Sequence, residues 1–158
     1  MANNFERMMQ VVNDTFDYKN DASQLHVTEE VITHLQKLHP ATLSELIEDD
    51  GHVVWILLIP TTEPVMHRFL EGTISEQQLL DETPVGIPYD ALYLCSASVL
   101  PEYRKKGIAK KITIEAIDSI RKDNPIKTLF YWPFTTEGEI LAESIAKKTG
   151  LPLLKKSI

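Results

Sequence analysis

The sequence contains very little cysteine and no long hydrophobic run. Cys95 is the only cysteine, so the chain has no partner for an internal disulfide bond and too few thiols for a cysteine-rich zinc site. The longest apolar run, residues 53–59, is far shorter than the roughly 20 residues that span a bilayer. The first ten residues hold no apolar segment of the kind found in secretory signals. These absences predict a cytoplasmic protein without a membrane partner.

Histidine is present, but not at a metal-binding spacing. The five histidines, at positions 26, 34, 39, 52 and 67, all lie in the first half of the chain, and none forms a His-x-x-x-His pair. We therefore expect no metal site, and we expect each histidine at the surface or at its boundary with the core. The rest of the composition, with 43% hydrophobic and 25% charged residues in 158, is that of a single globular domain.

Positive charge is scarce in the first part of the chain. Residues 1–90 hold 16 of the 23 acidic residues but only 4 of the 16 basic ones. The net charge of −7 argues against a general nucleic-acid binder, which is usually basic over its domain. A basic second half could hold a phosphorylated ligand and an acidic first half a cationic one. Two differently solvated faces of one domain would explain the same asymmetry.

Apolar periodicity and turn residues predict an alternation of helices and strands. The predicted helices are 5–16, one from Thr28 to the residue before Pro40, a short one beginning at a Thr42/Glu45 capping box, two pieces of 64–82 around Gly72, 107–122, and one beginning at Thr136. The predicted strands are 52–59, 91–99, 126–134 and a short one within 151–154. Before residue 51 we find no convincing strand, with 24–27 as a possible short edge strand.

The segment VLPEYRKKGIAKK, residues 99–111, carries the clearest functional signal. It leaves a predicted strand and enters a predicted helix with several cations at the helix N-terminus. Cations there oppose the helix dipole, but a bound anion would make them favourable. The free N–H groups of a helix N-terminus suit a phosphate, and Gly107 lets the backbone approach it closely. A cluster of solvated lysines is the alternative interpretation.

The order Arg104-x-x-Gly107-x-Ala109, preceded by Val99-x-Pro101, resembles the acyl-CoA signature of the GNAT superfamily of N-acetyltransferases. The resemblance covers roughly residues 90–151. It implies one α/β domain with a twisted, mostly antiparallel sheet and helices on both faces. The N-terminal part, 1–50, is expected to be helical, and 90–151 would form the acyl-CoA-binding core. Strands 91–99 and 126–134 would be parallel neighbours that splay apart around the thioester.

The resemblance also assigns residues to acetyl-CoA, the implied co-substrate. The strand end would hydrogen-bond the pantetheine arm, and the following turn would hold the pyrophosphate. The implied binding residues are Ala97, Ser98, Val99, Arg104, Lys105, Lys106, Gly107, Ile108, Ala109 and Lys110. A backbone N–H near Val99 would polarise the thioester carbonyl while an amine attacks it directly.

The usual acid and base of the family are absent at their usual positions. Glu139 stands where the family often has an Asn that contacts CoA, and Ala146 stands where it often has a Tyr that protonates the thiolate. Histone-type members place a basic Glu at the position of Tyr93. The replacements are Tyr131, Tyr93 and Asp90, each of which could instead serve only packing or solvation.

Two residues near these strands have structural interpretations. Cys95 is expected to be a small buried residue, since no histidine lies near it in the sequence. Trp132 is expected in the core, although Trp132, Pro133 and Phe134 could also wall a ligand cleft.

Two functions from different classes follow. The first is an acyl-CoA-dependent N-acyltransferase, with a cationic small molecule or a peptide as the amine acceptor. The second is a non-catalytic module that binds CoA or another phosphorylated ligand. A nucleotide-binding domain is weaker, because neither Gly-x-x-x-x-Gly-Lys-Ser/Thr nor Gly-x-Gly-x-x-Gly is present. The oligomeric state stays open, with a homodimer as one option.

Overall fold

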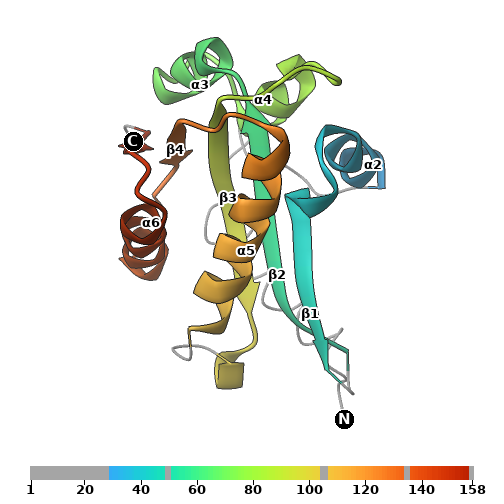
Figure 1. Cartoon of the computed structure of the whole chain (residues 1–158), viewed down its shortest axis with the longest axis vertical. Coiled ribbons are helices and arrows are strands. Elements are labelled where there is room, and N and C mark those ends of the chain that lie inside the picture. Colours follow the sequence, from blue (N-terminus) through green and yellow to red (C-terminus); the bar gives the residue numbers. More distant parts are fainter. Residues whose placement is uncertain (1–28, 49–50, 104–106, 134–135, 157–158) are drawn as a thin grey trace.

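The computed structural model describes residues 29–48, 51–103, 107–133 and 136–156, and its centre is a five-stranded sheet in the order β1-β2-β3-β4-β5 (Figure 1). The strands are β1 (Leu43–Glu48), β2 (Gly51–Thr61), β3 (Ala91–Val99), β4 (Thr128–Tyr131) and β5 (Leu153–Lys155). The helices are α2 (Glu29–Leu38), α3 (Glu63–Leu70), α4 (Glu76–Glu82), α5 (Ile108–Asp123) and α6 (Thr136–Thr149), with short 3-10 turns η1 (Pro40–Thr42) and η2 (Pro101–Tyr103). The predicted helix 5–16 and edge strand 24–27 lie outside the described residues.

The sheet is mixed, and its antiparallel ladders are the longer ones. β1 with β2 and β2 with β3 are antiparallel, whereas β3 with β4 and β4 with β5 are parallel. The predicted parallel pairing of 91–99 with 126–134 through the intervening helix is thus confirmed. The second of these strands is shorter than predicted, because regular pairing is limited to Thr128–Tyr131.

Helices cover both faces of this sheet. Adjacent residues of a strand point to opposite faces, and Phe130 and Tyr131 make this visible. The Phe130 ring lies 6.0 Å from that of Phe69 in α3, whereas Tyr131 lines a depression together with Ala146 of α6. The predicted α/β layering is therefore confirmed.

The short helix predicted from Thr42 is wrong, because Leu43–Glu48 is strand β1. The Thr42 hydroxyl does not cap a following helix; it donates to the carbonyls of Leu35 and His39 at 3.0 and 2.8 Å. Six residues of β1 pair with β2 instead. The expected helical N-terminal part therefore contains a strand, and the expectation of no strand before residue 51 is also wrong.

The other early elements follow the prediction closely. Helix α2 buries one face, which is made of Val31, Leu35 and Leu38. The two predicted helical pieces around Gly72 are α3 and α4, and α4 begins with a Ser75/Gln78 capping box. Helix α5 buries Ala116, Ile117 and Ile120 against the sheet. These contacts supply most of the core between the helices and the antiparallel strands.

His39 corrects the expectation that every histidine lies at the surface or at its boundary, because only 6% of it is exposed. Its Nδ1 accepts the Ala41 backbone N–H at 3.0 Å, so the proton sits on Nε2, which donates to Asp123 at 2.7 Å. His39 thus joins the end of α2 to the end of α5 as a satisfied core histidine.

Candidate functional site

Strands β3 and β4 run side by side for only three residue pairs. Ala91, Leu92 and Tyr93 pair with Thr128, Leu129 and Phe130, and β3 then continues to Val99 without β4 beside it (Figure 1). We call this divergence the strand split. On the opposite edge, β3 stays paired with β2 to its end. The pairing of β3 with β4 thus ends early, which agrees with the predicted splay between these two strands.

A β-bulge on β3 lies at the beginning of the split. Leu57 of β2 pairs with Ser96 and Leu58 pairs with Leu94, which leaves Cys95 as the extra residue of the ladder. Bulges change the direction of side chains and interrupt pairing, and they are frequent near active sites. Cys95 is half-buried here, rather than fully buried as expected.

The N-terminus of α5 begins shortly after β3 ends. At the lower end of β3 in Figure 1 the chain turns through η2, and α5 then runs back along the sheet. Gly107 is the N-cap of α5 with φ 75°, and Lys111 donates its backbone N–H to the Gly107 carbonyl at 3.0 Å. Among the described residues other than its chain neighbours, no atom lies within 4 Å of the position of a Cβ on Gly107, so the positive φ is what requires glycine here. None of these residues covers the helix N-terminus at this point.

The predicted acyl-CoA residues fall on these two elements or between them. Ala97 is exposed and Val99 half-buried at the end of β3, and the backbone of Ser98 pairs with Trp55. Ile108, Ala109 and Lys110 form the partly buried first turn of α5. Arg104, Lys105 and Lys106 lie outside the described residues.

A buried carboxylate that we did not predict lies at the beginning of the split. Glu76 is the first residue of α4 and only 2% exposed. Its Oε2 accepts the Tyr93 hydroxyl at 2.5 Å and lies 3.8 Å from the Cys95 sulfur. Burial raises the pKa of Tyr93 well above its usual value, and the nearby Glu76 charge raises it further. Tyr93 therefore remains a protonated donor to Glu76.

Sequence reasoning missed Glu76 for a local reason. A glutamate in the first turn of a short helix is normally a solvated residue that favours the helix dipole. The capping box fixed where α4 begins, but only the packing of α4 on the sheet brings this carboxylate to Tyr93, 17 residues away. The one available signal was Tyr93 itself, since a buried tyrosine hydroxyl needs a partner.

Tyr131, the second candidate, uses its hydroxyl on the other face of the sheet. The hydroxyl lies 3.5 Å from Glu139 Oε1, which also accepts Lys155 Nζ at 2.9 Å. Burial and the Glu139 charge raise the pKa of Tyr131, whereas Lys155 lowers the pKa of Glu139. The structure thus places Tyr131 and Ala146 around one depression of about 390 Å³.

Asp90, the third candidate, has a structural partner. Its Oδ1 accepts the backbone N–H of Glu63 at 2.9 Å, at the beginning of α3. Its backbone N–H and C=O bond Thr61 and Lys127, which ties three segments together. The three candidate side chains therefore face three different places, and of these Tyr93 lies at the last residue pair before the split.

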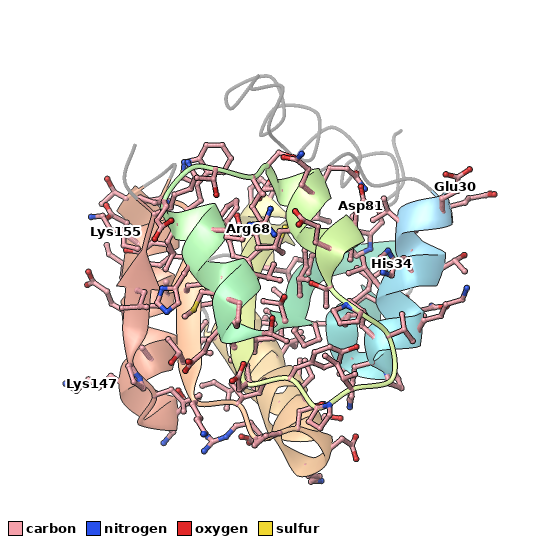
Figure 2. All side chains as sticks on the ribbon, turned by 90° about the horizontal axis from the view of Figure 1, so that it is seen from above. Glu30, His34, Arg68, Asp81, Lys147 and Lys155 are labelled. Atoms are coloured by element: carbon pink, nitrogen blue, oxygen red, sulfur yellow. The ribbon has the colours of Figure 1, made fainter. Side chains whose placement is uncertain are left out.

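The described residues form two depressions in the surface, one on α2 and one beside the end of β4. The larger, about 580 Å³, is on α2 and is lined by Glu29, Glu30, Thr33, His34, Lys37 and Val85. Figure 2 shows Glu30 and His34 on one side of the molecule and Lys155, beside the smaller depression, on the opposite side. Among the described residues there is no group of three or more His, Cys, Asp or Glu that could hold a metal ion. No helix in that part of the chain is long and apolar enough to cross a membrane.

Comparison with known proteins supports the fold. The chain is similar to two solved structures of the NatB acetyltransferase complex, one bound to a bisubstrate inhibitor and one bound to CoA and MES. The structure with the bisubstrate inhibitor has a TM-score of 0.52 and 12% sequence identity, and the match covers 88% of this chain and 68% of that chain. The structure with CoA and MES has a TM-score of 0.51 and 12% sequence identity, and the match covers 89% of this chain and 77% of that chain. No protein-family model and no curated protein matches the sequence. The chain therefore has an acetyltransferase-like α/β fold.

Proposed function

We propose that this protein is an acyl-CoA-dependent N-acyltransferase, with acetyl-CoA as the acyl donor and an amine as the acceptor. The observation that carries the proposal is the strand split directly before an open, glycine-capped helix N-terminus. The edge of β3 offers backbone N–H and C=O groups of the kind that bind an extended amide-containing arm. The first turn of α5 offers N–H groups for phosphate, with Lys110 adding positive charge. The fold shared with the NatB complexes supports the same function.

The proposed reaction is a direct transfer of the acyl group from the thioester to the amine. The amine nitrogen forms a bond to the thioester carbonyl carbon, the carbon–sulfur bond breaks, and the sulfur takes up one proton while the amine loses one. A β3 backbone N–H at the split would stabilise the oxyanion. We assign Glu76, reached through the hydroxyl of Tyr93, as the group that accepts the proton from the amine. Tyr131, on the other face of the sheet, is the candidate that would give the sulfur its proton.

The acceptor is proposed to be a cationic small molecule or a peptide amine. One of the similar NatB structures was solved with a bisubstrate inhibitor, which suits an acceptor site beside the donor site. The acidic bias of residues 1–90 favours a cation.

Thermal unfolding with acetyl-CoA, with ADP as the nucleotide control, tests binding. Ligand at 100 times its Kd stabilises by about 2.7 kcal/mol, which corresponds to a rise in Tm of roughly 5–10 °C for a domain of this size. Gly107→Glu should abolish this rise because it places a negative side chain at the helix N-terminus. Gly150→Glu is the matched control, since Gly150 has the same φ of 75° and the same open surroundings.

Release of free CoA in the presence of a panel of amines then separates an enzyme from a binding module. Turnover that is lost in Gly107→Glu and kept in Gly150→Glu would support the acyltransferase. A rise in Tm without turnover with any amine would favour the non-catalytic CoA-binding module. No rise in Tm with millimolar acetyl-CoA would reject both.

A further inference from the structure

Four aromatic rings form a cluster that begins in the buried core beside the strand split, where Phe69, Tyr93 and Phe130 lie, and ends at the half-buried Trp132. The Phe69 ring of α3 is at its centre, with centroid distances of 4.9 Å to Tyr93, 6.0 Å to Phe130 and 6.1 Å to Trp132. Tyr93 and Phe130 are the last residue pair before the split. Trp132 lies two residues beyond that pair, directly after β4, and it is the half-buried end of this aromatic cluster.

The ammonium group of Lys156 lies over two rings of this cluster, those of Trp132 and Phe69. Nζ of Lys156 lies 4.5 Å from the centroid of Trp132 and 5.7 Å from that of Phe69, within the range of cation–π attraction. The Lys156 backbone N–H donates to the Tyr131 carbonyl at 2.9 Å, which holds this part of the chain beside the end of β4. Lys156 is half-buried, and Trp132 is half-buried beneath it.

The preceding lysine has a different environment. Lys155 forms an ion pair with Glu139 at 2.9 Å on the α6 face. In the described part of the chain no carboxylate forms an ion pair with Lys156. Its ammonium group instead lies over the faces of two aromatic rings. Displacement of Lys156 from these rings by another ammonium group would therefore break no ion pair among the described residues.

We propose that the faces of Trp132 and Phe69 bind the ammonium group of the acceptor, a primary alkylamine, and that Lys156 occupies this seat until the acceptor displaces it. The inference rests on the proposed acyltransferase function and names the acceptor site within it. Lys156 carries the same functional group as such an acceptor, so its position marks where a primary ammonium fits. The seat adjoins Tyr93 through Phe69, and the Tyr93–Glu76 pair is the one assigned to accept the proton of the amine.

The other region that could attract a cation is less suitable. The depression on α2 contains Glu29 and Glu30, but also Lys37 and His34. It is lined by α2 and by Val85, and no residue of the strand split takes part in it. An amine bound there would not meet a thioester in the split.

The test is a titration of the full chain with n-butylammonium chloride, followed by the indole N–H signals in NMR. The sequence has two tryptophans, so Trp55→Phe leaves the Trp132 signal alone. Sodium chloride and n-butanol are the controls for ionic strength and for apolar binding. While Lys156 competes for the seat, the apparent Kd for n-butylammonium is the intrinsic Kd divided by the fraction of molecules in which Lys156 has left the seat. Lys156→Gln should therefore lower this apparent Kd about threefold or more. Lys155→Gln is the matched control on the other face and should leave the Kd unchanged.

Trp132→Phe should weaken the binding of n-butylammonium, because tryptophan is the strongest cation–π partner. For this variant we would measure the turnover of n-butylamine, and we expect the KM for n-butylamine to rise. The rise in Tm that acetyl-CoA causes should be the same as in the parent protein. The proposal is overturned if the Trp132 signal does not respond to n-butylammonium, if n-butanol produces the same response, or if Lys156→Gln binds no more tightly than the parent. Loss of the acetyl-CoA response in the parent protein would instead reject the acyltransferase function.

Discussion

Tyr93 and Glu76 place two polar groups within an apolar core, with 1% and 2% of their surfaces exposed. A buried carboxylate without hydrogen-bond donors is costly, so the Tyr93 hydroxyl at 2.5 Å stabilises Glu76 as much as Glu76 satisfies Tyr93. Their contact joins α4 to β3 at the beginning of the split. It therefore serves stability as well as the chemistry proposed for it.

Tyr93→Phe should lower the free energy of unfolding by about 1–3 kcal/mol, because it removes a donor from a buried carboxylate. Tyr131→Phe is the control, since that hydroxyl lies 3.5 Å from a half-buried glutamate that Lys155 also pairs, and the expected loss is below about 0.5 kcal/mol. Urea unfolding at neutral pH measures both. Equal losses in the two variants would contradict the structural account of the pair.

The same residue predicts a stability that falls in alkaline solution. The pKa of Tyr93 is raised above 10.0 in the folded protein by burial and then by Glu76. Above about pH 10 the unfolded chain loses this proton while the folded one keeps it, so the folded state is destabilised as the pH rises towards the folded pKa. Stability should therefore fall more steeply between pH 9 and 11 in the parent than in Tyr93→Phe. Tyr89 and Tyr131, whose pKa values burial also raises, leave a residual slope in both proteins.

Single residues differ in how far the sequence can predict their roles. Gly107 was predictable, because its requirement is local: a positive φ at the beginning of a helix. Glu76 was not, because its partner is set by how a seven-residue helix packs on the sheet. Lys156 was not predictable either, since cation–π contacts depend on ring positions from α3 and from the end of β4.

At the scale of secondary structure, α4 is short and depends on its first turn. Ser75 accepts the Gln78 N–H at 3.1 Å, and the Gln78 side chain accepts the Ser75 N–H at 2.9 Å. This capping box lies next to Glu76, the first residue of the helix. We therefore expect the cap to orient the carboxylate as well as to stabilise the helix.

Ser75→Ala should cost about 0.5–2 kcal/mol of stability through loss of the cap. Ser75→Asp should keep most of it, since aspartate is an equally good N-cap residue. If the cap also orients Glu76, turnover should fall in Ser75→Ala and recover in Ser75→Asp. Thermal unfolding and CoA release measure the two effects, and equal behaviour of both variants would exclude a role for the cap.

Strand β1 shows the limit of prediction for whole elements. The spacing of Leu43, Leu46 and Ile47, together with Thr42 and Glu45, is typical of a capped helix. Pairing with the strongly apolar β2 outweighs that preference, and six residues become strand. The elements that were predicted well, such as α2, α5 and β3, have local signals that agree with their packing.

For the whole molecule, the separation of charge predicts that acetyl-CoA binding weakens with salt. The net charge is −7, yet 12 of the 16 basic residues follow residue 90, and several of them surround Gly107 in the sequence. Salt screens such charges, with a Debye length of about 10 Å at 0.1 M and about 3 Å at 1 M. The affinity for acetyl-CoA should therefore fall several-fold from 0.05 to 0.5 M sodium chloride.

Calorimetric titration of two variants sharpens this prediction. Lys110→Gln should weaken binding and reduce the salt dependence, because Lys110 lies in the first turn of α5. Lys147→Gln, at the far end of α6, should change neither. A salt dependence that stays the same in Lys110→Gln would mean that the charge near Gly107 does not contact the ligand.

We expect the short pairing of β3 with β4 to divide the molecule into two units of unequal cooperativity. Strands β1 to β3 share long ladders. By contrast, β4, α6 and β5 are joined to them by three residue pairs, by the α5 crossover, by contacts between α5 and α6, and by the Phe69 ring. Such a narrow seam allows the smaller unit to open without global unfolding. Amide hydrogens of β4 and β5 should then exchange with deuterium faster than those of β2, and a ligand bound across the seam should slow that exchange by fastening the two units together.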